Sequence, residues 1–91
     1  MEIKREATAG TLESSDIMVT VMPWAEGVSI HLTSSVEEYY GDSIRATIAQ
    51  MLERLDARNV RVEAVDHGAL DCTIRARLTT ALRRASKEAA Q

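Results

Sequence analysis

Few side chains in this sequence are of the types that catalyse reactions or bind metals. There are two histidines, His31 and His67, and one cysteine, Cys72. None of them has the spacing of a metal site, such as C-x-x-C or H-x-x-x-H. We expect His31 on the polar face of a strand and His67 in the turn before a helix. Cys72 falls in the first turn of that helix, where a thiol pKa can be lowered, but a small buried or half-buried side chain is the preferred interpretation.

Serine hydroxyls are the remaining candidates for covalent chemistry. Ser14 and Ser15 stand in the string TLESSD, and local spacing places no histidine or lysine beside them to activate either hydroxyl. From the residues alone, this string predicts a turn or a cap, with Asp16 at the start of a strand. A further serine, Ser43, stands in the string GDSI. That string is similar to the Asp-Ser-Leu site at which ordinary acyl carrier proteins receive phosphopantetheine at a helix start.

The composition predicts one small soluble domain, residues 1–91. Hydrophobic residues make up 45% and charged residues 27% of the 91 positions, as is usual for globular domains. The net charge of −3, from 14 acidic and 11 basic side chains, argues against a general nucleic-acid binder. A single cysteine cannot form an internal disulfide. No apolar run suits a signal peptide or approaches the roughly 18 residues of a membrane span, so we expect a cytoplasmic protein.

The elements that must position these residues follow from hydrophobic periodicity. Residues 17–22 and 28–33 read as strands, and the five residues between them predict an antiparallel hairpin. Residues 59–66 read as a third strand. Residues 1–16 are small, polar and charged, and they predict a flexible lead-in without a strand or helix.

Two amphipathic helices are expected between and after these strands. The first is expected to include residues from about Asp42 to Leu55, and the second follows His67. Two starts are open for the first helix: a capping box of Ser35 with Glu38, or a cap at Asp42. The apolar stripes recur at helical spacing; they consist of Tyr40, Ile44, Ile48, Leu52 and Leu55 in the first helix and Leu70, Ile74, Leu78 and Leu82 in the second.

The order β-β-α-β-α predicts an α+β fold, a small two-layer sandwich. Its sheet should be three-stranded and mostly antiparallel, with both helices covering one face. Such a fold conflicts with a conventional phosphopantetheine carrier using Ser43, because that family is an all-helical bundle. A non-covalent interaction module, binding a protein through a sheet edge or its arginine-bearing helices, fits this fold. A stand-alone enzyme is the weakest hypothesis, since nothing pairs a nucleophile with a base.

Three blocks of the sequence resemble one family in particular. They are ATAGTLESSDIMVTV at residues 7–21, SSVEEYYGDSIRATI at 34–48 and VDHGALDCTIRARL at 65–78. On these blocks the chain resembles the citrate lyase acyl carrier protein family, the gamma chain of that complex. The blocks cover about half the chain and keep their order across nearly all of it.

The resemblance implies a carrier that is not itself an enzyme. In that family the serine after the Thr-Leu-Glu run carries the prosthetic group, which maps to Ser14. The group is 2'-(5''-phosphoribosyl)-3'-dephospho-CoA, a phosphoribosyl-dephospho-CoA attached through a phosphodiester, whose thiol holds acetyl or citryl as a thioester. The implied partners are a prosthetic-group transferase and the citrate lyase alpha and beta subunits. One of these subunits exchanges acetyl for citrate on the carrier, and the other cleaves the citryl thioester to oxaloacetate.

The sequence departs from the family pattern at three places. Ser15 stands where glycine is often found after the modified serine, so Ser15 stays a second candidate for attachment. The pair Tyr39 and Tyr40 stands where a polar residue and phenylalanine are usual. His67 replaces a commonly basic lysine, which alters the local charge at neutral pH. None of these changes removes the serine.

Overall fold

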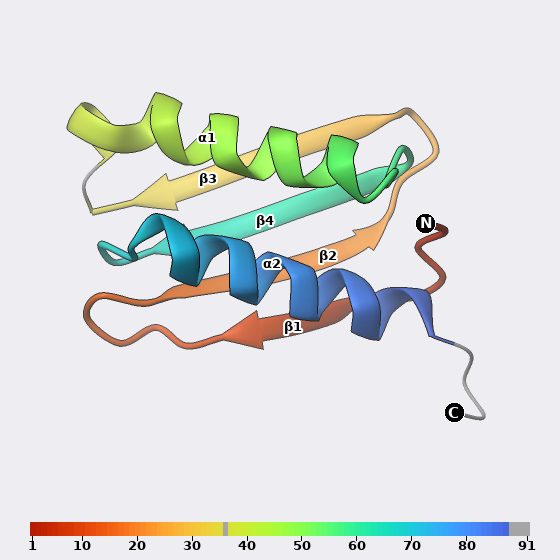
Figure 1. Ribbon diagram of the computed structural model, residues 1–91, viewed down its shortest axis with the longest axis horizontal. Coiled ribbons are helices and arrows are strands. Elements are labelled where there is room, and N and C mark those ends of the chain that lie inside the picture. Colours follow the sequence, from red (N-terminus) through yellow and green to blue (C-terminus); the bar gives the residue numbers. More distant parts are fainter. Residues whose placement is uncertain (36, 88–91) are drawn as a thin grey trace.

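The computed structural model describes residues 1–35 and 37–87, without the side chains of Glu37 and Glu38. It contains four strands and two helices in the order β1-β2-β3-α1-β4-α2 (Figure 1). Their bounds are β1 Ala7–Gly10, β2 Ile17–Pro23, β3 Val28–Ser34, α1 Glu37–Arg54, β4 Val60–Asp66 and α2 Asp71–Ser86.

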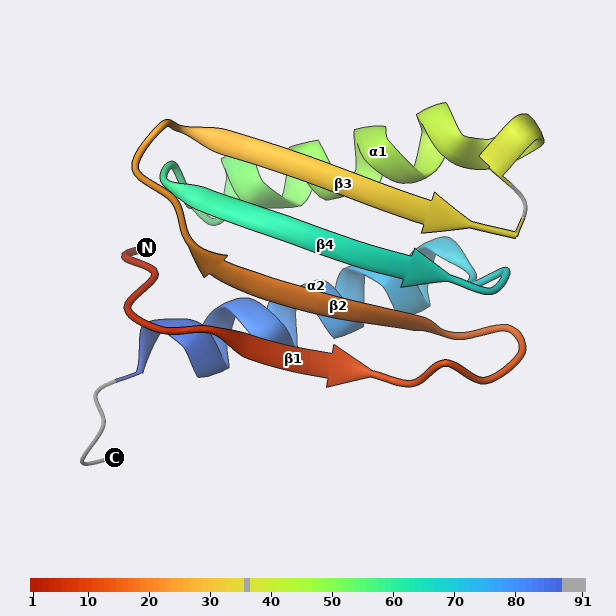
Figure 2. The same ribbon diagram turned by 180° about the vertical axis from the view of Figure 1, so that it is seen from behind.

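The strands form one mixed sheet in the order β1-β2-β4-β3. β2 pairs antiparallel with β1 and with β4, and β3 pairs parallel with β4. Both helices lie on one face of this sheet, and no described helix or strand covers the other face (Figures 1 and 2). The α+β two-layer architecture is therefore confirmed, but the sheet has four strands and not three.

The predicted hairpin between residues 17–22 and 28–33 is wrong, because β4 lies between β2 and β3. The connection between β2 and β3 bonds to the start of β4 instead of closing a tight turn. Trp24 N donates to the Asn59 carbonyl at 3.2 Å, and Val60 N donates to the Gly27 carbonyl at 3.0 Å. Alternation predicts which face of a strand is buried, but it does not identify the neighbouring strand.

The lead-in is also different from the prediction, because Ala7–Gly10 forms the edge strand β1. Its small residues carry little strand signal, and the pairing with β2 supplies the stabilisation that the local sequence lacks. Ile3 and Ala9 are buried in the core. Lys4 N and Arg5 N both donate to the Ala85 carbonyl, at 2.9 and 3.2 Å. Residues 1–16 are thus attached to both the sheet and α2.

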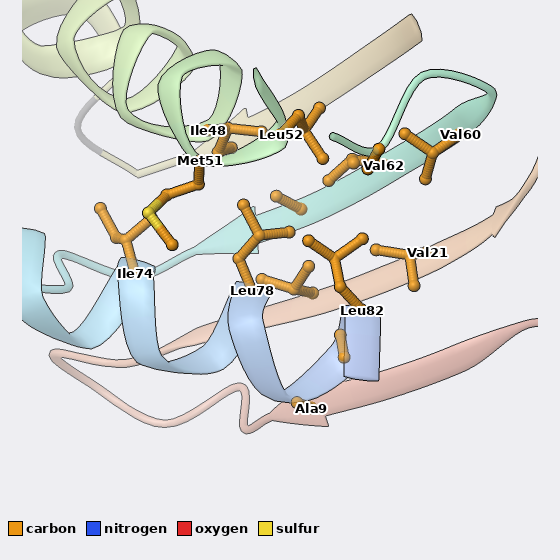
Figure 3. Close-up of a cluster of buried hydrophobic side chains, with 14 of the residues drawn as sticks. Ala9, Val21, Ile48, Met51, Leu52, Val60, Val62, Ile74, Leu78 and Leu82 are labelled. Atoms are coloured by element: carbon orange, nitrogen blue, oxygen red, sulfur yellow. The ribbon is translucent and has the colours of Figure 1, made fainter. Parts of the chain in front are cut away.

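The core lies between the sheet and the two helices, where the predicted apolar stripes meet β2 and β4 (Figure 3). Ile48 of α1 and Leu78 and Leu82 of α2 are completely buried, and each such side chain contributes on the order of 2–3 kcal/mol to folding. Most of the two predicted stripes is confirmed. Tyr40 and Leu70 are the exceptions, since their side chains are 60% and 70% exposed, and Leu70 precedes α2 as its N-cap.

Helix α1 begins at Glu37, ahead of Asp42, which is one of the two starts predicted from the sequence. Asp42 is therefore an interior residue of the helix and not its cap. The alternative capping box of Ser35 with Glu38 depends on a side chain outside the described residues. Within the described ranges, no helix is both long and apolar enough to cross a membrane.

Candidate functional site

Ser14 lies in the connection between β1 and β2, at one end of the sheet. Asp16 N donates to the Glu13 carbonyl at 3.2 Å, which closes a β-turn with Ser14 and Ser15 as its two central residues. The Ser14 side chain is exposed. No residue among 1–35 and 37–87 hydrogen-bonds its hydroxyl. The hydroxyl is thus accessible, and no bond to a described residue occupies it.

The backbone of the turn distinguishes Ser14 from Ser15. Ser15 has a φ of +66°, a conformation that a type II turn requires at its second central position and that favours glycine. Its backbone N–H donates to the His67 carbonyl at 2.8 Å. The glycine often found at this position in the resembling family fits the same backbone geometry. Ser14 stands at the first central position, where no such constraint applies.

Asp16 attaches the turn to helix α2. Arg77 donates from Nε to Oδ1 at 3.1 Å and from Nη2 to Oδ2 at 2.8 Å. Thr11 Oγ1 donates to the same carboxylate at 2.6 Å, and Ile17 N does so at 2.7 Å. The hydrogen bonds from Arg77, Thr11 and Ile17 hold the pKa of Asp16 well below its usual range. The carboxylate therefore stays ionised and fixes both ends of the connection.

The β4–α2 connection, residues 67–70, holds the other side of the turn. Asp66 is 1% exposed and accepts hydrogen bonds from Ser34 Oγ at 2.9 Å and from Gly68 N and Ala69 N at 3.0 Å each. His67 N in turn donates to the Asp16 carbonyl at 2.9 Å. Together with the bond from Ser15 N, this reciprocal pair joins the two connections side by side.

A groove of about 390 Å³ opens at this same end, between the N-terminal part of α1 and the start of α2. Thr47 Oγ1 donates to Asp71 Oδ1 at 2.7 Å across the two helices. A hydrogen bond from Arg75 and this one from Thr47 lower the pKa of Asp71. Ser43 lies on α1 at the edge of the groove and is exposed. The groove is otherwise lined mainly by Tyr40, Ile44, Ala69, Leu70 and Ile74.

The other residues singled out from sequence are not brought together. His31 is exposed on β3, opposite Glu63 of β4. His67 is half-buried and contributes through its backbone. Cys72 is exposed, so the expected buried or half-buried side chain is wrong: this position of the first turn of α2 faces away from the sheet. In the described parts of the chain, no three His, Cys, Asp or Glu residues are placed to hold a metal ion.

The pair of Asp16 and Arg77 is the feature of the site that sequence reasoning missed. The two residues are 61 positions apart, so no local spacing connects them. The sequence feature that could have suggested this pair is an aspartate directly before a strand, at the end of the sheet where a helix also begins.

Comparison with known proteins places the chain among the acyl carrier proteins. A family model with the short name ACP, described as "Malonate decarboxylase delta subunit (MdcD)", matches residues 4–85. A chain in the crystal structure of a Pseudomonas malonate decarboxylase hetero-tetramer in complex with malonate has the same fold, with a TM-score of 0.75 at 22% identity. The alignment covers 92% of this chain and 87% of that one.

Relatives with higher sequence identity identify the family more specifically. The citrate lyase acyl carrier protein of Lacticaseibacillus casei is 57% identical over 86 residues, covering 94% of this chain and 85% of the relative. The protein of the same name from Halothermothrix orenii is 52% identical over 89 residues, covering 98% and 95%. The one from Streptococcus mutans is 53% identical over 88 residues, covering 96% and 86%. The chain belongs to the citrate lyase acyl carrier protein family.

This membership confirms the resemblance stated from the three sequence blocks. It also makes the chain a carrier rather than a catalytic subunit. Acyl carrier proteins hold their cargo on a covalently attached prosthetic group.

Proposed function

We propose that this chain is the acyl carrier subunit of a cytoplasmic citrate lyase, loaded at Ser14 with phosphoribosyl-dephospho-CoA through a phosphodiester. The observation that carries the proposal is the position of Ser14 in its turn. Its hydroxyl is exposed and makes no hydrogen bond with any described residue, while the residues on either side of it are fixed. Family membership supports the class of group, and the exposed hydroxyl in the turn supports Ser14 as the attachment point.

The turn fits a large attached group. Its anchors are the backbone of Ser15 and the carboxylate of Asp16, and none of them involves the Ser14 side chain. A phosphodiester on Ser14 Oγ therefore breaks no bond that holds the turn. The same anchors hold the attachment point at a fixed place on the surface, so that movement is left to the attached group.

When attached, the group supplies a terminal thiol on which acyl groups are carried as thioesters. The chain itself needs no base beside Ser14, because a separate transferase activates the hydroxyl. The carrier presents its cargo first to the subunit that exchanges acetyl for citrate and then to the subunit that releases oxaloacetate. Tethering gives a high effective concentration at each partner without tight protein binding.

The alternative attachment point is Ser43, as in conventional phosphopantetheine carriers. Ser43 is exposed at the edge of the groove, so access alone does not separate the two serines. The four-stranded sheet, however, differs from the all-helical bundle of the conventional carriers. A non-covalent interaction module is the second alternative, and it requires no adduct on any serine.

Peptide mapping by mass spectrometry tests the proposal. The protein is co-expressed with the transferase of a citrate lyase system, and its intact mass is measured before proteolysis. We expect a phosphate-containing adduct on the peptide 7–18 that is lost in Ser14→Ala and kept in Ser15→Ala and Ser43→Ala. An adduct lost only in Ser15→Ala would move the site by one residue. Phosphopantetheine on Ser43, or no adduct with the partners present, would reject the proposal.

A further inference from the structure

Leu70 occupies a position at which folding alone favours a polar residue. It is the N-cap of α2, with φ −70° and ψ 157°, and its side chain makes no capping hydrogen bond. Ser, Thr, Asp and Asn stabilise such a position, whereas Leu does not. The Leu70 side chain is also 70% exposed, so little burial offsets the missing cap. The stability of the fold does not account for this residue.

Leu70 belongs to a group of exposed apolar side chains at the Ser14 end of the molecule. The described chain exposes six large hydrophobic residues. Four of them, Leu12, Tyr39, Tyr40 and Leu70, come from the β1–β2 connection, the start of α1 and the start of α2. All three segments lie at the same end of the sheet (Figures 1 and 2). We call these four residues the tyrosine–leucine face.

Two members of the tyrosine–leucine face, Tyr40 and Leu70, line opposite sides of the groove between α1 and α2. A third member, Leu12, is two residues from Ser14. Exposed apolar groups around a groove mark surfaces that bind other proteins, and tyrosine is among the residues that contribute most at such interfaces.

Some of the acidic side chains near this face are paired with arginine, and others are not. Asp16 and Asp71 are paired with Arg77 and Arg75. Glu13 and Asp42 are exposed, and neither carboxylate forms an ion pair with any residue in the described ranges. Glu13 and Asp42 thus add negative charge to this end of the molecule, which is complementary to a partner surface with lysine or arginine.

We propose that the tyrosine–leucine face is the docking surface for a catalytic subunit of the lyase complex, one whose contact surface is apolar at its centre and basic at its rim. The proposal rests on the proposed function, because any subunit that acts on a group tethered at Ser14 must approach this end of the molecule. Contact at this end buries side chains that the isolated chain leaves exposed. The exposed Leu at the cap position is then explained by binding and not by folding.

The test uses the unloaded carrier, so that binding does not depend on the prosthetic group. The ¹⁵N-labelled Ser14→Ala protein is titrated with the purified citrate lyase alpha subunit and, separately, with the beta subunit. With at least one of them, we expect amide signals to shift or broaden at Leu12, Tyr40 and Leu70 while signals of the open sheet face stay unchanged. Shifts confined to other surfaces, or no shift with either subunit, would overturn the proposal.

The variant Leu70→Ser separates binding from folding. Serine supplies the missing cap, so the unfolding midpoint should be unchanged or higher. The dissociation constant for the same subunit should rise about tenfold. Val28→Ser is the matched control, because Val28 is 50% exposed at the start of β3, at the opposite end of the sheet, and should leave the affinity unchanged. Equal affinities of Leu70→Ser and the parent protein would contradict the proposal even if mass spectrometry confirms loading at Ser14.

Discussion

Asp16 and Arg77 are joined by two hydrogen bonds across 61 positions of sequence, and this pair connects the Ser14 turn to the middle of α2. A bidentate contact between guanidinium and carboxylate fixes orientation as well as distance. The turn is therefore positioned by a helix that contributes no residue to it. If Ser14 carries the prosthetic group as proposed, this pair holds the attachment point at a fixed place on the surface.

Replacing Asp16 with Asn should lower the unfolding midpoint by several degrees, because Arg77 loses its ionised partner and Thr11 loses an acceptor. The pKa of Asp16 in the folded protein lies below the value near 3.9 of an unfolded chain. The stabilisation is thus fully present above about pH 4 and is lost as the pH falls through the folded pKa. Thermal unfolding of both proteins at several pH values measures the difference.

Asp56→Asn is the control for this prediction. Asp56 is paired with Arg58 through a contact whose side chains are 62% and 81% exposed, so its loss should change stability little. If Asp16→Asn were no less stable than Asp56→Asn at neutral pH, the anchoring role of Asp16 would be wrong. A difference that stayed constant down to pH 2 would contradict the electrostatic explanation.

Gly10→Ala should destabilise the protein strongly. Gly10 has a φ of +98°, and a Cβ built there would overlap the carbonyl oxygen of Ile17 in the paired strand. Because that oxygen is backbone, β1 and β2 would have to separate at the entry to the Ser14 turn. We expect a loss of about 3 kcal/mol or more in the free energy of unfolding, measured by urea titration.

Gly27 provides the matched comparison for Gly10. Its φ is +99°, but a Cβ at this position meets no atom within 4 Å. Gly27→Ala should therefore cost only the backbone strain, about 1 kcal/mol. Equal losses for the two variants would show that the close approach of Ile17 does not matter.

Ser15→Gly should stabilise the turn. The φ of +66° at Ser15 is strained for a residue with a Cβ, and its relief should raise the free energy of unfolding by about 0.5–1 kcal/mol. The same variant should still accept the prosthetic group, since Ser14 is unchanged. Ser15→Val, with a branched side chain, should be less stable than the parent protein. A loss of stability in Ser15→Gly would mean that the Ser15 side chain contributes more than the backbone strain costs.

The parts of the fold that depend on local periodicity could be predicted from the sequence. Leu78 and Leu82 recur every four residues, and that spacing places them on one buried side of a helix whatever the neighbours are. Strand β1 could not be found this way, since the residues ATAG are small and their stability comes from pairing with β2. The position of β4 between β2 and β3 is likewise set by contacts between distant segments.

The proposed attachment at Ser14 came from resemblance to a family and not from local sequence features. An exposed serine in a turn has no local signal that distinguishes it from other exposed serines. The groove and the tyrosine–leucine face depend on the packing of α1 beside α2. Tyr40 illustrates the difficulty, because its spacing predicted a buried position while the structure leaves it 60% exposed. Periodicity predicts the face of a helix, but not where the covering sheet ends.

Asp66 should be the most sensitive polar residue of the site. It is 1% exposed and accepts hydrogen bonds from Gly68 N and Ala69 N as well as from Ser34. Asp66→Ala leaves these donors without their acceptor, at a cost of about 2–4 kcal/mol. Asp66→Asn keeps one carbonyl oxygen and should cost roughly half as much. Urea unfolding measures both losses.

Hydrogen exchange distinguishes a local role of Asp66 from a general loss of stability. In Asp66→Ala the amides of Gly68 and Ala69 should exchange much faster than those of β4. The amide of Ser15 should follow them, because it donates to His67 in the same connection. Loading of Ser14 by the transferase should then slow, since the turn is no longer held on that side. If the Ser15 amide kept its protection while Gly68 lost it, the two connections would be independent, and the fixed presentation of Ser14 would depend on Asp16 and Arg77 alone.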